Sequence, residues 1–274
     1  MIRIAIVVDN KGADGFAAEH GFALWLEADG RVILFDTGNQ DALSINADKL
    51  NLDFTDLTDM VLSHGHYDHT GGIEAVLQKT STLRVYLHQA AMQPRYSRRD
   101  GDARPVRMSA GAMKALWDLK DESIHWLTRP YKITDRIGIT GPISRGTDYE
   151  DTGGAFFYDP WGERPDPIED DNAVWVHTGN GLVICVGCSH AGIVNTIETV
   201  IEVTGETKIH TVIGGLHLLN ASQQRLEQTA QALNSFDIGQ LIACHCTGDE
   251  AFAYLEKRVN CKIMQGYAGF SMMI

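Results

Sequence analysis

Four side chains that can bind metal ions fall within the six residues from His64 to His69, where the sequence reads His-Gly-His-Tyr-Asp-His. An apolar run at 59–62 predicts a short buried strand before them, and the apolar spacing of 73–77 predicts a helix after them. Gly65 allows a sharp turn, so the four side chains lie on a loop between the strand and the helix. Three histidines in one loop are difficult to explain as core packing, because each buried ring needs its own hydrogen-bond partner. The stretch therefore predicts a metal site.

Imidazole and carboxylate ligands together favour zinc, iron or manganese over calcium. Each catalytic metal needs at least three protein ligands and an open position, so this loop does not complete two sites by itself. His190 and His245 each follow an apolar run that predicts a strand, which would deliver them to one edge of the fold, as it does His64. The other interpretation of His190 is a residue of a capped turn beside Ser189.

The pattern His-x-His-x-Asp-His after a strand resembles the signature of the metallo-β-lactamase superfamily. The resemblance extends to residues 32–38, which look like the superfamily's strand that ends in an aspartate near the metals. Residues 62–72 and 186–192 are similar to a branch whose members are often labelled dihydropterin-ribofuranosyl-aminobenzene-phosphate synthase-like. The resemblance implies an α/β fold, a four-layer αββα sandwich, with two divalent metal ions. It covers most of the chain except roughly residues 92–165.

On this resemblance we assign the metal ligands in two groups, with zinc favoured and iron or manganese as alternatives. Asp68 is expected both to ligate a metal and to position a metal-bound hydroxide. Asp36 is expected to orient a ligand histidine, although an aspartate at a strand end can also be a helix cap or a turn residue. The first metal is assigned His64, His66 and His190, and the second is assigned Asp68, His69 and His245.

The sequence departs from the superfamily pattern at the position of its usual bridging aspartate. The candidate strand ends at 187–190 and 214–217 contain no aspartate. Either His190 stands at the bridging position and an earlier ligand is missing, or water forms the bridge. We expect His217 and Cys188 to line the pocket. The cysteines lack the arrangement of about four thiolates that an iron–sulfur cluster needs, so we interpret them mainly as core or pocket-wall thiols.

The charge and cysteine content exclude several classes of protein. With 36 acidic and 23 basic residues, the formal net charge is −13. This charge argues against a nucleic-acid-binding protein, because nucleic-acid binding needs a basic surface. Five cysteines are an odd number for a disulfide framework and favour reduced thiols in the cytoplasm. No apolar run approaches the roughly 18 residues of a membrane span.

The chain reads as one domain over 1–274, interrupted by a less regular segment. Residues 92–165 contain glycines, prolines and few periodic runs, and we expect this insertion to cover the metal site as a lid. Within it, Arg95, Arg98 and Arg99 are expected to bind an anionic substrate, unless they belong to a solvated surface loop. The expected strands are 2–8, 22–27, 32–35, 59–62, 83–87, 133–139, 172–177, 181–186, 208–213 and 240–243, and the expected helices are 41–50, 73–77, 108–119, 193–203, 223–233 and 250–258.

These observations favour a metal-dependent hydrolase. In this hypothesis a metal-bound hydroxide attacks an ester, amide or phosphoester of a small anionic metabolite. Two alternatives remain at this point. The branch label implies a pterin-precursor synthase, whereas histidine and carboxylate ligands also suit an iron-binding redox or sensor protein.

Overall fold

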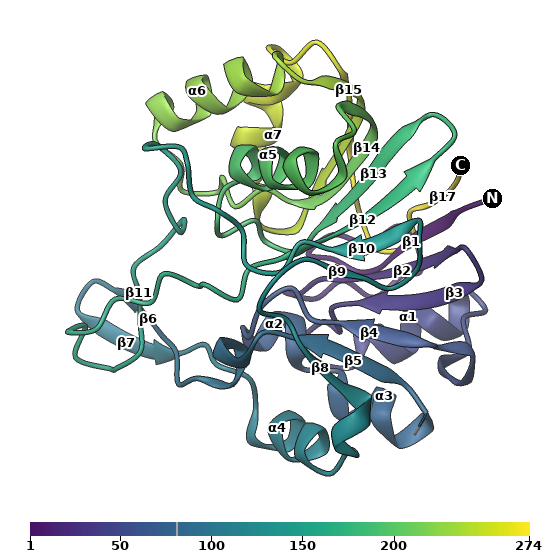
Figure 1. Ribbon diagram of the computed structural model, residues 1–274. Coiled ribbons are helices and arrows are strands. Elements are labelled where there is room, and N and C mark those ends of the chain that lie inside the picture. Colours follow the sequence, from purple (N-terminus) through teal and green to yellow (C-terminus); the bar gives the residue numbers. More distant parts are fainter. Residues whose placement is uncertain (81) are drawn as a thin grey trace. The chain divides into compact units, whose positions relative to one another are not determined.

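The computed structural model describes residues 1–80 and 82–274, and Figure 1 shows its ribbon. The chain divides into two compact units. Unit 1 comprises Met1–Thr128, Phe156–Asp166 and Tyr267–Ile274, and unit 2 comprises Arg129–Ala155 and Pro167–Gly266. Each unit is built on a seven-stranded mixed sheet with helices, so the α/β class predicted from the sequence is confirmed.

The large sheet of unit 1 has the strand order β17-β1-β2-β3-β4-β5-β8. Its first part is antiparallel, and the predicted hairpin joins β2 to β3 through Asp29 and Gly30, which both have positive φ. From β3 to β8 the strands are parallel, so their carboxyl ends lie along one edge. The strands are β1 (Arg3–Val8), β2 (Ala23–Ala28), β3 (Arg31–Phe35), β4 (Asp59–Val61), β5 (Arg84–Leu87), β8 (Ile124–Trp126) and β17 (Ser271–Met273).

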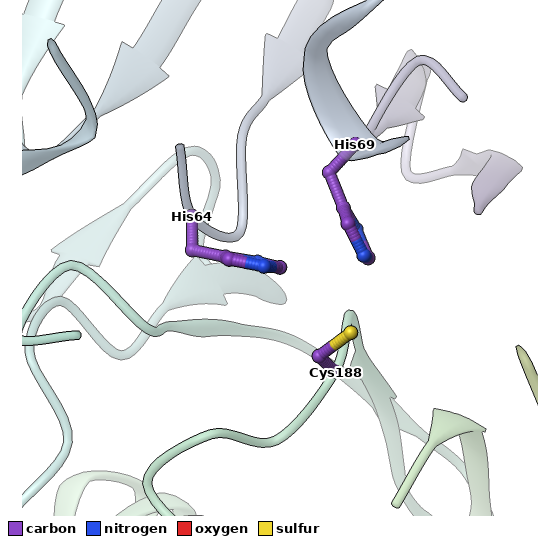
Figure 2. A group of neighbouring side chains, drawn as sticks. All are labelled: His64, His69 and Cys188. Atoms are coloured by element: carbon purple, nitrogen blue, oxygen red, sulfur yellow. The ribbon is translucent and has the colours of Figure 1, made fainter. Parts of the chain in front are cut away.

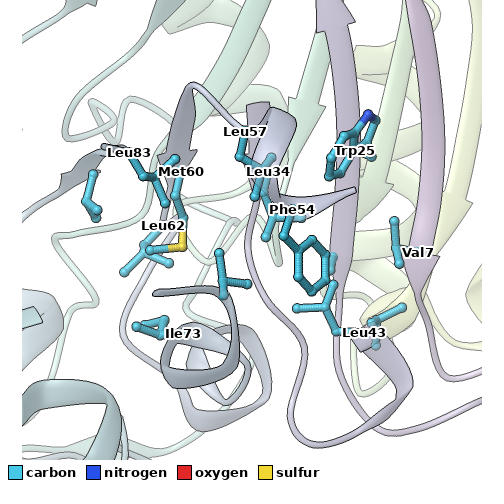
Figure 3. Packing of buried hydrophobic residues seen from close by; sticks show 14 of the residues in the cluster. Val7, Trp25, Leu34, Leu43, Phe54, Leu57, Met60, Leu62, Ile73 and Leu83 are labelled. Carbon is cyan, nitrogen blue, oxygen red and sulfur yellow. The ribbon is translucent and has the colours of Figure 1, made fainter. Parts of the chain in front are cut away.

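One face of this sheet packs against helices to form the core of unit 1. Leu34 and Met60 from the sheet pack in one cluster with Leu43 of α1 and Ile73 of α3, and Figure 3 shows this packing. Burial of each such side chain contributes about 1.5–3 kcal/mol, which makes the strand ends a rigid support for the loops that follow them. The helices of unit 1 are α1 (Ala42–Lys49), α2 (Tyr67–Thr70), α3 (Ile73–Lys79) and α4 (Ala110–Trp117), with short 3₁₀ turns η1 (Phe54–Asp56), η2 (Gln89–Met92) and η3 (Asp121–Ser123).

Unit 1 also contains a small three-stranded sheet that the sequence pattern did not predict. Its order is β11 (Phe156–Phe157), β6 (Tyr96–Arg99), β7 (Asp102–Pro105). Just before β6, Arg95 is fully buried, and its Nε lies 2.8 Å from Oδ2 of the buried Asp166. This ion pair joins two parts of unit 1 that are far apart in the chain.

The sheet of unit 2 has the order β16-β15-β14-β13-β12-β10-β9. Strands β13 to β16 are parallel, so the residues that follow β13, β14 and β15 meet at one edge of the sheet. Helices α5 (Ile193–Thr204), α6 (Gln223–Leu233) and α7 (Asp249–Glu256) enclose a second apolar core, and η4 (His245–Thr247) follows β15. The strands are β9 (Tyr131–Lys132), β10 (Ile137–Ile139), β12 (Ala173–Thr178), β13 (Gly181–Val186), β14 (Lys208–Gly215), β15 (Asp237–Cys244) and β16 (Lys262–Gln265).

The segment 92–165 is more regular than the sequence suggests. It supplies the edge strand β8 to unit 1 and the strands β9 and β10 to unit 2, besides the small sheet and α4. Within residues 1–80 and 82–274, no helix combines the length and the apolar character needed to cross a membrane.

Candidate metal centre

The loop after β4 brings three histidine rings together in unit 1. His64 and His66 lie on the loop, and His69 lies on α2; all three are buried. The Nε2 atom of His64 is 2.9 Å from Nδ1 of His66, and the ring centroids of His64 and His69 are 4.2 Å apart. Figure 2 shows the His64 and His69 rings pointing toward a common space. Two nitrogens bound to one tetrahedral zinc are roughly 3.3 Å apart, so the spacing and the donor types fit a shared ion.

Asp36 fixes the orientation of two of these histidines. It is fully buried at the end of β3, where its backbone adopts a φ of 60°, and this strained conformation is typical of functional sites. Its Oδ2 accepts hydrogen bonds from Nδ1 of His69 at 2.7 Å and from Oγ of Ser63 at 2.6 Å, and its Oδ1 accepts from the Ser63 amide. Because the Ser63 hydroxyl donates to Asp36, it accepts from Nδ1 of His64, 2.9 Å away. Both histidines therefore carry their proton on Nδ1 and keep Nε2 for a metal.

Asp68 lies beside the histidine cluster and contacts a residue that the sequence analysis did not identify. Its Oδ2 is 3.8 Å from Nε2 of His69 and 3.3 Å from Nε2 of His20. The side chain of His20 is 56% exposed, whereas that of Asp68 is 9% exposed, so His20 contacts the carboxylate from its solvent side. Burial and the neighbouring Asp68 charge raise the pKa of Tyr67 above its ordinary value. No local pattern marks His20, because its contact with Asp68 depends on the fold.

The loop is held in place by backbone contacts within unit 1. An ideal Cβ on Gly65 would lie 2.2 Å from the carbonyl oxygen of Ala91, so only glycine allows this close approach. On the other side, His66 forms a β-bridge with Arg107, and its ring centroid is 4.9 Å from that of Phe156. The small sheet is thereby connected to the histidine loop through β11.

In unit 2, the residues after three parallel strands form a second group of possible ligands. Cys188 and His190 follow β13, His217 follows β14, and His245 and Cys246 follow β15. The ligand atoms of Cys188, His190 and His217 all lie within 4.8 Å of one another, and those of Cys188, His245 and Cys246 do so as well. His217 and His245 have φ values of 47° and 51°, and such strained backbone is concentrated at functional sites.

A loop of unit 2 orients His190 and His217. Nδ1 of His190 lies 2.8 Å from the carbonyl oxygen of Thr152, which can only accept a hydrogen bond, so Nδ1 carries the ring proton and Nε2 is the nitrogen of this ring with a lone pair for a metal. An ideal Cβ on Gly153 would lie 1.7 Å from Cδ2 of His217, and this glycine has a φ of 78°. Glu150 anchors the loop by accepting hydrogen bonds from two backbone amides at the start of α5. Burial raises the pKa of Glu150 above its ordinary value.

The remaining predicted residues have contacts within their own units. The ion pair with Asp166 already neutralises Arg95, and Arg98 donates to the carbonyl oxygens of Pro160 and Trp161. Arg99 is exposed. Binding of an anion by these arginines stays a prediction, as does the assignment of ligands from both units to shared metals.

Comparison with known proteins gives matches along nearly the whole chain. The family described as the metallo-beta-lactamase superfamily matches residues 18–198. A 7,8-dihydropterin-6-methyl-4-(beta-D-ribofuranosyl)-aminobenzene-5'-phosphate synthase of Methanocaldococcus jannaschii is 28% identical over 86% of this chain and 83% of that protein. An uncharacterized protein of the same organism is 30% identical over 97% of this chain and 98% of its own length. The crystal structure of a metal-dependent hydrolase of the beta-lactamase superfamily has a TM-score of 0.86 at 32% identity, and the match covers 100% of this chain and 99% of the other.

Proposed function

Because this chain belongs to the metallo-beta-lactamase superfamily and has its fold, we propose that it is a metal-dependent hydrolase. Its substrate would be an ester, amide or phosphoester of a small anionic metabolite. The observation that carries this proposal is the hydrogen-bond network of Asp36, Ser63, His64 and His69, which fixes the orientation of two buried imidazole rings in one loop.

The donor set suits zinc, with iron or manganese as alternatives. A divalent metal bound there would lower the pKa of water toward about 7 and polarise the scissile group. The role of the surrounding residues is to orient the candidate metal ligands. Asp36 fixes the rings of His64 and His69, and His20 holds the outer side of Asp68. In hydrolysis the oxygen of water forms a bond to the attacked carbon or phosphorus, and the departing group leaves with its bond electrons and takes up a proton.

An anionic substrate is supported by an arginine beside the histidine loop. The backbone of Arg107 bridges His66, while its side chain is exposed and remains available to solutes. Charge-assisted hydrogen bonds contribute about 1.5–3 kcal/mol each, so Arg107→Ala should raise KM by about 10- to 100-fold. Arg104→Ala is the matched control, because Arg104 is an exposed arginine in β7 that does not bridge the loop. Equal KM values for both variants and the native protein would remove Arg107 from the substrate site.

The second candidate function is that of the synthase relative. Its name describes the synthesis of a dihydropterin-methyl-ribofuranosyl-aminobenzene 5'-phosphate, and its 28% identity extends over 86% of this chain. That product is anionic and phosphorylated, which also agrees with an arginine near the site. A synthase would need two organic reactants, whereas a hydrolase needs one substrate and water.

One experiment separates the two candidates. Metal-loaded protein is incubated with a panel of esters and phosphoesters, and separately with a dihydropterin together with a ribofuranosyl-aminobenzene 5'-phosphate; products are identified by mass spectrometry. We expect hydrolysis of a panel member that is lost in His66→Ala. Formation of the joined product only when both precursors are present would favour the synthase and refute the hydrolase. Hydrolysis that persists in His66→Ala would also refute the proposed site.

A further inference from the structure

An aromatic side chain of the small sheet contacts the histidine loop within unit 1. The ring centroid of Phe156 in β11 is 4.9 Å from that of His66, and the two ring planes are inclined by 37°. The segment after β7 is held against the same loop by its backbone, since the carbonyl oxygen of Val106 accepts a hydrogen bond from the amide of Tyr67 at 3.0 Å. These contacts place Phe156 at the border of the candidate metal centre.

The side chains of the small sheet belong to two faces. Figure 1 shows β11, β6 and β7 side by side, and residues directly opposite each other on neighbouring strands point to the same face. Phe156 is opposite Ser97, which is opposite Arg104, and these three residues define the Phe156 face. Phe157 is opposite Tyr96, and this pair defines the Phe157 face.

The Phe157 face is used for packing. The Cβ atoms of directly opposite residues such as Phe157 and Tyr96 are about 4.5–5.5 Å apart, so these two aromatic side chains are neighbours. Arg98, two residues after Tyr96 in β6, shares this face and donates hydrogen bonds to the carbonyl oxygens of Pro160 and Trp161. The turn that follows β11 is therefore attached to this side of the small sheet.

The Phe156 face differs because the residue opposite Phe156 is small. Ser97 has a short side chain that covers little of the ring, and both residues are half-buried. Arg104 follows two strands from Phe156, which is roughly 10 Å in backbone spacing. Aromatic rings pair in offset or edge-to-face arrangements at centroid distances of about 4.5–7 Å. Because His66 is itself 4.9 Å from Phe156, a group attached to a ring that Phe156 binds can reach the histidine loop.

We propose that Phe156 binds a planar apolar group of the substrate, an inference that rests on the proposed function. The contact gives the protein a preference for aryl over alkyl esters and phosphoesters. Phe156 acts by touching the substrate, so its effect depends on which group the substrate carries. A phenylalanine that only supported the His66 ring would instead alter the binding of every anionic ligand equally.

The test compares phenylphosphonate with methylphosphonate, two ligands that differ in their apolar group and contain no ester bond to hydrolyse. Their Kd values are measured by calorimetry on the zinc-loaded protein. We expect the native protein to bind phenylphosphonate about 10-fold more tightly, which is the lower end of the gain for burying a phenyl group. Phe156→Ala should reduce this ratio of Kd values by about 2- to 10-fold, the range that an aromatic pair contributes.

The neighbouring phenylalanine provides a matched control. Phe157 is the next residue of β11, is also half-buried and points to the other face, so Phe157→Ala should keep the native ratio. Phe156→Tyr should keep it as well, because tyrosine retains the ring. Circular dichroism and metal analysis establish that each variant is folded and loaded. If Phe156→Ala does not fold, Phe156→Leu replaces it, since leucine is apolar and has no ring.

Three results would overturn the proposal: equal Kd values for the two phosphonates in the native protein, no binding of either, or an unchanged ratio in a folded Phe156→Ala or Phe156→Leu protein. An equal rise of both Kd values would show that the ring only supports His66. In the native protein, nuclear Overhauser contacts should connect the bound phenyl ring with Phe156, and their absence would contradict the contact. Binding of phenylphosphonate through Phe156 without hydrolysis of any ester or phosphoester would refute the hydrolase and confirm the aryl site.

Discussion

Replacing Asp36 by asparagine tests how ligand orientation is achieved in unit 1. The native carboxylate accepts three hydrogen bonds, two from Ser63 and one from His69. An asparagine that keeps its oxygen toward the Ser63 amide must turn its NH2 group toward the Ser63 hydroxyl and His69 Nδ1. His69 then has to accept at Nδ1 and carry its proton on Nε2, and the Ser63 hydroxyl is free to impose the same change on His64.

The magnitude follows from the number of histidines affected. Loss of one residue that orients a metal ligand costs about 10- to 100-fold in affinity, or about 1.4–2.8 kcal/mol. Because Asp36 orients two histidines, we expect Asp36→Asn to raise the zinc Kd by about 100-fold, at the upper end of this range. In the metal-free protein, the substitution should lower the free energy of unfolding by about 1–2 kcal/mol, which is the difference between charged and neutral hydrogen bonds.

The assay is a competition titration of zinc against a chromophoric chelator, with urea unfolding of the metal-free protein alongside. Asp59→Asn is the matched control, since Asp59 is equally buried in unit 1 but pairs with Arg31 and Arg84 away from the histidines. It should lower stability without changing zinc affinity. An unchanged zinc Kd in a folded Asp36→Asn protein would show that Asp36 does not orient the metal ligands, and an equal weakening in Asp59→Asn would show that the effect is not specific to Asp36.

Three further predictions concern single positions. His66→Ala should lose most of one metal equivalent, measured by elemental analysis, and its fold should persist by circular dichroism; unchanged metal content would remove His66 from the ligands. Gly153→Ala should lower the melting temperature, because its Cβ would overlap the His217 ring at a φ of 78°, and an unchanged melting temperature would show that the ring moves freely. Burial raises the pKa of Asp171 to about 7, so the native state keeps a proton that the unfolded chain releases near pH 4, and stability of the metal-free protein should fall as pH rises from about 4 to 7. Urea unfolding should show this fall in the native protein and a flatter profile in Asp171→Asn; parallel profiles would count against the raised pKa.

The sequence predicted most of the two large sheets because their strands are apolar and bounded by turn residues. The hairpin at Asp29 and Gly30 and the helix over α5 are examples. The small sheet was not predicted, since β6 and β7 contain mainly charged or exposed residues with no alternation of apolar side chains. Strand β17 escaped prediction for another reason: Ser271–Met273 is a short edge strand that is defined by its pairing with β1.

The site could be predicted where its residues are close in sequence. Three histidines and one aspartate within a short loop form a recognisable pattern of metal ligands, and the role of the aspartate at the end of β3 was inferred from the family resemblance. Contacts between distant segments could not be predicted, such as His20 with Asp68 or the carbonyl of Thr152 with His190. For Cys246, the adjacent His245 was a signal, but only the fold brings its thiol close to Cys188.

If the histidine loop holds the catalytic metal, turnover must depend on that metal. The most direct test is to strip the protein with a chelator, add zinc in measured fractions of an equivalent, and record hydrolysis of the best phosphoester or ester at each step. We expect no activity in the stripped protein and a rise in activity in proportion to bound zinc until the site is filled. Full activity in stripped protein that elemental analysis finds free of metal would contradict it.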